Sequence, residues 1–248
     1  MAGSRLADRV ALITGAAGTI GRATARRFAQ EGADVGVADL RLADVEPLAA
    51  ELGGLALELD VRSDEGWAVA VAALTSRFGR LDVLVNNAGV ADSAGLEELD
   101  LQVWNQILAV NQTGVLLGMR HAAREMKRCG GGSIVNISSI HGLVGKLSPD
   151  GSAIAYTATK GAVRMMSKAA AMDLGGDGIR VNSVHPGYVD APMQGAKPAG
   201  REHAVTRTPF GKLVSADEVA AGILFLASPD STMITGTELT IDGGYTAN

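Results

Sequence analysis

A tyrosine and a lysine four residues apart are the residues whose types and spacing most suggest chemistry. Tyr156 and Lys160 lie in AYTATKGAVRMMSKAAAM, Ala155–Met172, which has the pattern of a long apolar helix. Residues four apart share one helix face, with about 5–6 Å between their Cβ atoms, so the phenol and the ammonium should project from the same side. Such a pair could move a proton, or it could be two amphipathic side chains on a helix rim. The spacing alone leaves both interpretations open.

Apolar runs and helical patterns alternate along the chain and define the elements that must position this pair. Strands are expected at Val10–Thr14, Asp34–Asp39, Leu55–Asp60, Leu81–Asn86, Ser133–Ser138, Ile179–Val184 and Glu238–Asp242. Helices are expected between them, including Ile20–Glu31, Asp64–Phe78, Trp104–Arg128, Ala155–Leu174 and Ala216–Ala227. This alternation is typical of βαβ units and predicts an α/β fold, with a parallel sheet covered by helices on both faces.

The chain has no evident linker, repeat or low-complexity segment, so residues 1–248 are predicted to form a single dinucleotide-binding and catalytic domain. One long irregular stretch, about 187–214, contains GAKPAGREH. Loops of this length inside a compact domain are usually functional, so we expect a substrate loop there.

Composition and charge exclude several classes of function. The net charge is −5 with no basic block, which argues against nucleic acid as a partner. Cys129 is the only cysteine, which predicts no internal disulfide and no cysteine zinc site and fits a reducing cytoplasm. The four histidines show no spaced metal pair, so no catalytic metal is expected. The apolar run near the N-terminus is too short for a signal peptide or a membrane span.

A glycine-rich turn between the first strand and the first helix predicts a nucleotide site. In TGAAGTIG, Thr14–Gly21, backbone amides can approach a phosphate, and the helix N-terminus adds about half a positive charge. Asp39 ends the second strand, where a carboxylate can bind the adenosine ribose and repel a 2′-phosphate. A turn without a ligand and a solvated carboxylate are the alternatives. Asp39 favours NAD, whereas the nearby Arg41 keeps NADP open.

Seven motifs in order resemble those of the short-chain dehydrogenase/reductase family over nearly the whole chain. They are TGAAGTIG at Thr14–Gly21, LDV at Leu59–Val61, NNAG at Asn86–Gly89, VNQTG at Val110–Gly114, NISS at Asn136–Ser139, YTATK at Tyr156–Lys160 and HPGYV at His185–Val189. GGGSIVNISS and IRVNSVHPG are most similar to bacterial NAD-linked members that oxidise secondary alcohols or hydroxysteroids. The family implies a Rossmann-like, doubly wound sheet of seven parallel strands. It also implies homotetramers or dimers built on the two long helices.

The resemblance assigns the catalytic roles to Asn111, Ser139, Tyr156 and Lys160. Tyrosine has an unperturbed pKa near 10, but a lysine ammonium and a cationic nicotinamide both favour the phenolate. Tyr156 would then take the hydroxyl proton in oxidation and return it in reduction, while Lys160 lowers its pKa and holds the nicotinamide ribose. Ser139 would donate a hydrogen bond to the substrate oxygen, with Ser138 as its rival on the opposite strand face. Asn111 would hold a water that links Lys160 to solvent; the alternative is a buried, satisfied asparagine.

The cofactor and substrate contacts also follow from the resemblance. The implied cofactor residues are Gly15, Thr19, Ile20, Gly21, Asp39, Leu40, Asp60, Val61, Asn87, Ala88, Gly89, Tyr156, Lys160, Pro186, Gly187 and Val189. His141, two residues after Ser139, and Met193, in the irregular stretch, are candidate substrate contacts. No aromatic cage is evident, because aromatic residues make up only 4% of the chain.

Three positions depart from the family pattern. Thr19 replaces the middle glycine of the turn, and Ala191 replaces a threonine expected near the nicotinamide amide, which removes one hydrogen bond of about 0.5–1.5 kcal/mol. Ser139 and Tyr156 are 17 residues apart, more than is usual in the family. The extra residues lie in KLSPDGSAIA and are expected beside the substrate mouth.

The leading hypothesis is an NAD-dependent dehydrogenase of a secondary alcohol, reversible on the ketone, with a hydroxysteroid-like, cyclic or sugar-like substrate. One alternative is an NADP-dependent reductase of acyl-carrier-bound ketones, for which Arg41 is a hint. The other is a non-catalytic nucleotide sensor on the same fold. The complete set of four catalytic residue types argues against a sensor, although a fold alone never proves activity.

Overall fold

Seven parallel strands form the centre of the protein, for which a computed structural model describes residues 4–146, 151–191 and 198–247. The strand order is β3-β2-β1-β4-β5-β6-β7, so chain direction across the sheet reverses between β1 and β4. The strands are β1 Val10–Thr14, β2 Asp34–Asp39, β3 Leu55–Glu58, β4 Val83–Asn86, β5 Gly132–Ile137, β6 Ile179–Pro186 and β7 Glu238–Ile241. The predicted Rossmann-like fold class is confirmed.

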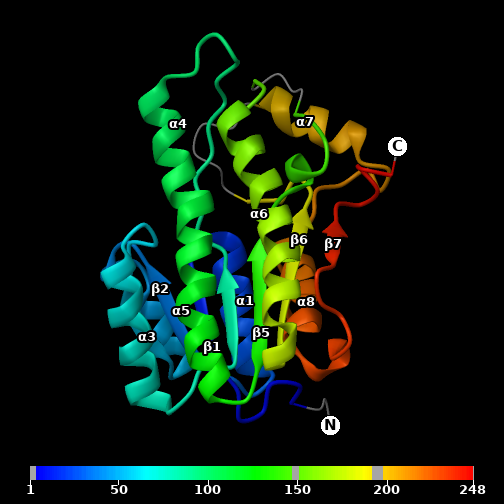
Figure 1. The fold of residues 1–248 in the computed structure, drawn as a ribbon. Coiled ribbons are helices and arrows are strands. Elements are labelled where there is room, and N and C mark those ends of the chain that lie inside the picture. The colour runs from blue at the N-terminus through cyan, green and yellow to red at the C-terminus, as the bar shows by residue number, and fades with distance from the viewer. Residues whose placement is uncertain (1–3, 147–150, 192–197, 248) are drawn as a thin grey trace.

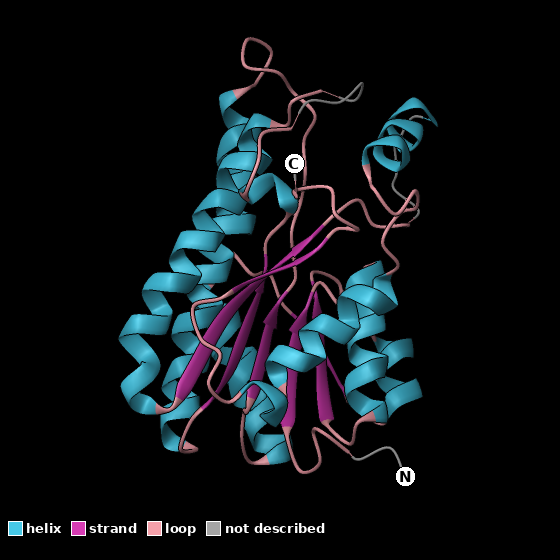
Figure 2. Cartoon of the chain, turned by 90° about the vertical axis from the view of Figure 1, so that its right-hand side faces the viewer, coloured by secondary structure: helices cyan, strands magenta, loops and turns pink. Residues whose placement is uncertain are grey.

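Helices cover both faces of the sheet (Figures 1 and 2). The helices are α1 Thr19–Gln30, α2 Glu46–Leu52, α3 Asp64–Phe78, α4 Leu101–Leu108, α5 Gly114–Arg128, α6 Ile154–Leu174, α7 Pro198–Arg207 and α8 Ala216–Ala227. Two apolar clusters result, one between the sheet and α3, α5 and α6, the other between the sheet and α1, α2 and α8. Strands buried on both faces favour nearly continuous apolar runs, such as VALIT in β1, in which only the last residue is polar.

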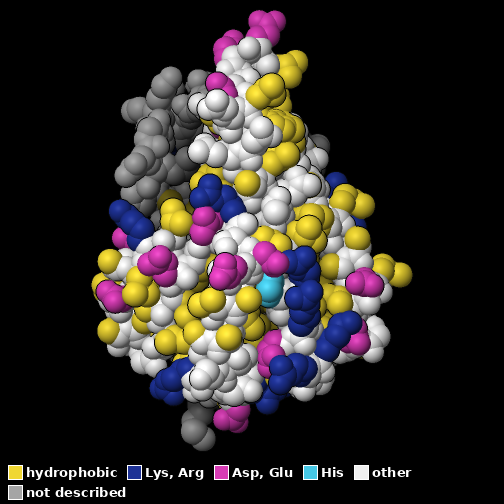
Figure 3. Space-filling model, turned by 60° about the vertical axis from the view of Figure 1, so that its left-hand side comes forward, with side chains coloured by type: hydrophobic (Ala, Val, Ile, Leu, Met, Phe, Trp, Pro, Cys, Tyr) yellow, Lys and Arg dark blue, Asp and Glu magenta, His cyan; other side chains and the backbone are white. Residues whose placement is uncertain are grey.

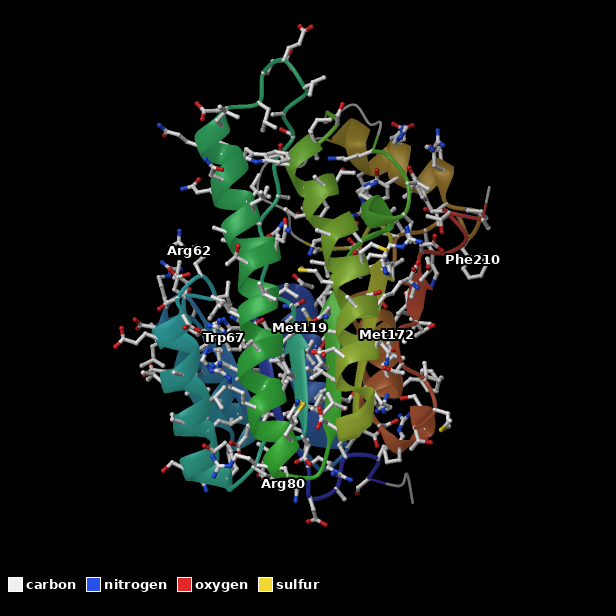
Figure 4. All side chains as sticks on the ribbon, in the orientation of Figure 1. Arg62, Trp67, Arg80, Met119, Met172 and Phe210 are labelled. Atoms are coloured by element: carbon white, nitrogen blue, oxygen red, sulfur yellow. The ribbon has the colours of Figure 1, made fainter. Side chains whose placement is uncertain are left out.

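Packing of α3 on α5 shows how one glycine lets two helices meet. Trp67 of α3 is fully buried and lies between the two helices in Figure 4. A Cβ on Gly118 would come within 2.8 Å of its indole ring, so only glycine leaves room there. The indole nitrogen donates to the Val61 carbonyl at 2.9 Å. This bond ties the loop after β3, a predicted adenine contact, to the core.

Two sequence predictions are wrong in detail. The stretch 187–214 is not irregular throughout, because it contains α7, and Val189 and Val214 form a β-bridge. Proline and glycine obscured this helix, but proline at its first position costs no hydrogen bond. A single helix was expected at Trp104–Arg128. The structure instead has two helices, α4 and α5, joined by one turn of π-helix at Ala109–Thr113, which is called the π-turn below. Helix α2 was not predicted, since seven residues give little periodicity.

No helix in the part of the chain that the structure describes is both long and apolar enough to cross a membrane.

Candidate active site

The motif residues meet at the carboxyl ends of the strands, around the reversal between β1 and β4. The glycine turn follows β1, NNAG follows β4, Ser139 follows β5 and the PG motif ends β6. Open parallel sheets bind ligands at this edge, beside the point where strand order reverses. The topology therefore brings together segments that are far apart in the sequence.

The glycine turn needs glycine at two positions for steric reasons. Gly15 has φ +63°, and a Cβ there would lie 2.7 Å from the Ala88 Cα. A Cβ on Gly21 would collide with the Gly15 carbonyl oxygen. The first and last glycines of the motif thus let the turn, the NNAG segment and α1 approach one another closely.

The start of α1 offers backbone amides to an anion. Gly18 is the N-cap and provides no side-chain hydrogen bond, so the first-turn amides of Thr19, Ile20 and Gly21 have no side-chain cap. The Thr19 side chain is exposed rather than packed inside the turn. Helix N-termini with uncapped amides are suited to phosphate groups.

A threonine that the sequence analysis overlooked holds the turn against the neighbouring segment. The buried Thr14 hydroxyl accepts hydrogen bonds from the backbone N–H groups of Asn87 and Ala88, both at 3.1 Å. The Asn87 amide in turn donates to the carbonyls of Thr14 and Gly15 at 2.9 and 3.0 Å. The Asn87 side chain therefore stabilises the glycine turn by binding the carbonyl groups at its start.

Asp39 occupies the end of β2 with both carboxylate oxygens anchored. One oxygen accepts from Ala17 N at 2.9 Å and the other from Leu40 N at 2.8 Å. Each oxygen keeps capacity for a further bond, because an ionised carboxylate has about four acceptor sites. Arg41 is paired with Asp44 at 2.8 Å on the surface. Arg41, the residue that favoured NADP as the alternative cofactor, thus already has a carboxylate partner.

Asp60, two residues after the end of β3, is held by the nearby Arg62. Arg62 contacts its carboxylate with the guanidinium, at 2.6 Å for the closest pair, and with its backbone N–H at 3.0 Å. Side-chain hydrogen bonding with Arg62 lowers the pKa of Asp60 despite partial burial. The carboxylate stays ionised and fixed beside Val61.

Tyr156 and Lys160 do lie together on one side of α6. The Lys160 ammonium is buried, lies 5.5 Å from the centroid of the Tyr156 ring and donates to the Ile137 carbonyl at 2.8 Å. Burial lowers the pKa of Lys160 to about 8. Burial raises the pKa of Tyr156, and hydrogen bonding with the Ser139 hydroxyl opposes that rise. In the protein alone, the phenol is therefore held in its protonated form.

The two serines after β5 face different ways, as strand alternation requires. The Ser138 hydroxyl donates to the Lys160 carbonyl at 2.8 Å and so supports α6. The Ser139 hydroxyl lies with Tyr156 and accepts from His141 N at 3.1 Å. Behind it, His185 is fully buried and its Nδ1 lies 2.9 Å from the Ser139 carbonyl oxygen. His185 thus fixes the backbone that carries Ser139.

Asn111 lies at the centre of the π-turn between α4 and α5. π-turns inside helices are frequent at functional sites. Its carbonyl oxygen Oδ1 accepts from Val90 N at 2.8 Å, and its Nδ2 donates to Val90 O at 2.8 Å and to Thr159 Oγ1 at 3.1 Å. A Cβ on Gly89 would lie within 4 Å of both Asn111 Oδ1 and Lys160 Nζ, so glycine keeps the space beside these atoms open.

Two further features could not have been predicted from the spacing of residues in the sequence. Asp92 accepts from Tyr156 N at 3.2 Å and so anchors the first turn of α6. Tyr188 lies edge-on between His141 and Tyr245, with ring centroids 5.7 and 5.6 Å away. All three tyrosines of the chain therefore lie in or beside this region.

Met193 falls outside the described residues, as do residues 147–150 of the longer Ser139–Tyr156 segment.

The backbone near Ala191 leaves hydrogen-bonding groups available despite the missing threonine hydroxyl. In the bridge between residues 189 and 214, Val214 N donates to Tyr188 O at 2.9 Å and Asp190 N donates to Val214 O at 2.8 Å. The N–H and C=O of Val189 itself then point to the opposite side, because these groups alternate along an extended chain.

Comparison with known proteins identifies the family. A family model described as enoyl-(acyl carrier protein) reductase matches residues 15–246. The chain is 43% identical to 2,5-dichloro-2,5-cyclohexadiene-1,4-diol dehydrogenase LinX of Sphingobium indicum, over 98% of each chain. It is 43% identical to trans-4-hydroxycyclohexanecarboxylate dehydrogenase of Sinomonas cyclohexanicum, over 98% of this chain and 95% of that protein. It is 42% identical to 3-alpha-(or 20-beta)-hydroxysteroid dehydrogenase of Mycobacterium tuberculosis, over 98% and 91%.

A solved structure agrees with the sequence matches. A short-chain type dehydrogenase/reductase from Mycobacterium marinum superimposes with a TM-score of 0.92 at 33% identity, covering 98% of this chain and 97% of that chain. The chain belongs to the short-chain dehydrogenase/reductase family, as the motifs predicted. It is an oxidoreductase that acts on CH–OH groups and their carbonyl counterparts.

The hydrogen bonds that the Thr14 hydroxyl accepts from Asn87 N and Ala88 N, here called the Thr14 clamp, can be tested by mutation. Replacing Thr14 with Val keeps the shape but leaves the partly buried N–H groups of Asn87 and Ala88 without this partner, at up to about 1–3 kcal/mol for each group. We expect urea denaturation to show a loss of stability of that order, whereas T14S, which keeps the hydroxyl, should stay near wild type. Equal stability of T14V and T14S would contradict the clamp.

Proposed function

We propose that the protein is an NAD-dependent dehydrogenase of secondary alcohols, that it acts reversibly on the ketones, and that cyclic alcohols are its preferred class. The observation that carries this proposal is the convergence of Ser139, Tyr156 and the buried Lys160 at the sheet edge that also carries the glycine turn and Asp39. The names of the relatives support the substrate class, because they describe dehydrogenases of ring-borne alcohols, including a cyclopentanol dehydrogenase.

The residues present fit a nicotinamide dinucleotide. The close-packed glycine turn and the uncapped amides of α1 suit the pyrophosphate, and Asp39 has acceptor capacity for the adenosine ribose hydroxyls. We propose that the contacts run along Gly15, Thr19, Ile20, Gly21, Asp39, Leu40, Asp60, Val61, Asn87, Ala88, Gly89, Tyr156, Lys160, Pro186, Gly187 and Val189. The free backbone groups of Val189 would replace the contact that Ala191 lacks.

Tyr156 is the proton acceptor for oxidation in this proposal. A nicotinamide held at this site would supply the acceptor for the hydride of the alcohol carbon. The alcohol O–H proton passes to the Tyr156 oxygen, while the Ser139 hydroxyl hydrogen-bonds the substrate oxygen as its charge changes. In the reverse direction Tyr156 returns the proton to the oxygen of the reduced ketone.

Lys160 and Asn111 support this proton transfer. Burial raises the pKa of Tyr156, so the phenolate needs nearby positive charge to form. The Lys160 ammonium provides such a charge, and a carbonyl holds it in place. The π-turn at Asn111 and the space at Gly89 lie beside the ammonium, which supports a water-mediated path from Lys160 to solvent.

The choice of NAD over NADP rests on the charges at the end of β2. A 2′-phosphate at the ribose would meet the Asp39 carboxylate, and the pairing of Arg41 with Asp44 competes with any contact that Arg41 could make to that phosphate. The surface pair is weak, about 0–1 kcal/mol, so Asp39 is the main determinant.

The substrate side is formed by segments on the open edge of the site. We propose that His141 contacts the substrate and that residues 187–214, including α7, cover it, with Met193 as a further contact. We also propose that residues 1–248 act as one domain and that the protein functions in the cytoplasm, as its single cysteine suggests.

Exposed apolar side chains on the long helices support a homotetramer or homodimer. Leu101 and Val103 of α4, Leu116 of α5, and Met165 and Met172 of α6 are exposed to solvent in the single chain. Figure 3 shows apolar side chains grouped over part of the face turned forward, and Figure 4 labels Met172 on α6. Burying such side chains favours association, so we propose that these helices form subunit contacts.

The proposed function predicts NAD-linked oxidation of cyclic secondary alcohols, followed as absorbance at 340 nm. Y156F should lower kcat by at least about 100-fold, because it removes the proton acceptor, yet it should still bind NADH, because the other proposed cofactor contacts remain. Near wild-type turnover by Y156F would contradict the mechanism. Turnover only with NADPH and acyl-carrier-bound ketones would favour the reductase alternative. NADH binding without turnover of any substrate would favour the sensor.

The role of Asp39 predicts a change in cofactor preference. D39N keeps the shape of the side chain but removes the charge that repels a 2′-phosphate and strengthens the ribose bonds. We expect the ratio of kcat/KM with NAD to kcat/KM with NADP to fall by about tenfold or more, since hydrogen bonds to charged groups contribute about 1.5–3 kcal/mol. Asp34 begins the same strand at the opposite, exposed end, so D34N is the matched control and should leave the ratio unchanged. An unchanged ratio in D39N would contradict this assignment.

A further inference from the structure

Three buried polar atoms without a hydrogen-bond partner belong to segments that carry or adjoin the catalytic residues. Among the described residues, Nδ1 of His141, Oδ2 of Asp92 and Oγ1 of Thr157 are buried and find no hydrogen-bond partner. They come from three segments: the turn after β5, the loop after β4 and α6 itself. Buried polar groups in folded proteins are nearly always bonded, and an unpaired one costs about 1–3 kcal/mol. An unpartnered atom on a residue that is bonded to a catalytic side chain points to a ligand that completes the bonding.

His141 is the best placed of these groups. His141 is 6% exposed, and its backbone N–H donates to the Ser139 hydroxyl, the group expected to contact the reacting oxygen. Its ring is held edge-on against Tyr188 of the PG motif. The imidazole therefore lies between two parts of the site and has little freedom to turn elsewhere.

The turn that carries His141 is rigid. Residues Ile140–Gly142 form a 3₁₀ turn capped by Ser139. A Cβ on Gly142 would lie 2.7 Å from the Lys160 carbonyl oxygen and from the Ser138 hydroxyl, so the turn is pressed against the catalytic helix α6. A group held on such a support is suited to reading one position of a substrate.

The imidazole is neutral under ordinary conditions. Burial, together with the positive charge of Lys146, lowers the pKa of His141 to about 4, and a hydrogen bond with the Val144 backbone opposes part of this shift. A neutral imidazole donates from one nitrogen and accepts at the other, and a hydroxyl group can partner either nitrogen, so it can partner the unpaired Nδ1. It offers no charge to a carboxylate.

We propose that His141 determines specificity by binding, through Nδ1, a second hydroxyl of the substrate, so that the enzyme prefers a cyclic diol to the corresponding simple alcohol. This inference deepens the proposed function and depends on it. The reacting hydroxyl is bound by Ser139 and Tyr156, and the second is bound on the neighbouring turn. A substrate that lacks it leaves Nδ1 unpaired, which is how polar sites reject apolar analogues.

The experiment compares three six-membered-ring alcohols with NAD: cyclohexanol, cyclohexane-1,4-diol and 4-hydroxycyclohexanecarboxylate. For wild type we expect kcat/KM for the diol to exceed that for cyclohexanol by about tenfold or more. H141F keeps the ring contact with Tyr188 but cannot bond the hydroxyl, so the diol-to-cyclohexanol ratio should fall towards one. H141N places an amide near the position of Nδ1 and should retain part of the preference. Cyclohexanol in each variant is the internal control, since a merely structural defect would lower both substrates equally.

The outcomes separate this inference from the proposed function. A wild-type ratio near one, or an H141F variant that keeps the wild-type ratio, would overturn the role of His141 while leaving the alcohol dehydrogenase intact. Preference for the carboxylate over the diol would overturn the claim that His141 binds an uncharged hydroxyl. If H141F does not fold, as judged by its Tm, the ratio in H141N decides: a wild-type Tm with a changed ratio supports a substrate contact. No oxidation of any of the three would contradict the proposed function itself.

Discussion

Burial of the Lys160 ammonium is the constraint on which the catalytic end of the molecule depends. An ammonium removed from water is costly unless acceptors surround it, and here the Ile137 carbonyl at the end of β5 meets it at 2.8 Å. That contact requires β5 to end beside α6, and the Ser138 bond to the Lys160 carbonyl fixes the same junction from the other side. Asp92 anchors the start of α6 at Tyr156 N. Tyr156 and Lys160 are thus positioned by the end of β5 and by the loop after β4.

The cofactor half of the site depends on steric closeness rather than on charge. Gly15 and Gly21 allow the turn, the start of α1 and the NNAG segment to pack with almost no space between them, and the Thr14 hydroxyl bonds the segments together. The result is a rigid platform of backbone amides with one carboxylate, Asp39, at its outer edge. Pre-organised donors of this kind bind an anion without first having to reorder.

Much of this architecture could be predicted from the sequence, because the periodicity of buried strands and the motif order are local signals. β1, β2, α3 and α8 begin and end at the predicted residues. The sequence could not reveal the π-turn at Asn111, since a helix with one widened turn keeps the same apolar pattern. It also could not show that Thr14, Asp92, Tyr188 and His185 converge on the site. Their partners are distant in sequence, and their residue types are common in ordinary strands, loops and cores.

The pH dependence of alcohol oxidation tests the central claim, that Lys160 promotes proton transfer to Tyr156. Oxidation needs the phenolate, so kcat/KM should rise with pH, with an apparent pKa that belongs to the coupled pair and lies below the usual tyrosine value near 10. Removing the positive charge raises the pKa of Tyr156, so Lys160→Met should shift this rise to higher pH by about one unit or more. A profile in Lys160→Met that is lower in amplitude but unchanged in position would contradict the account, because Lys160 would then hold the cofactor without tuning the base.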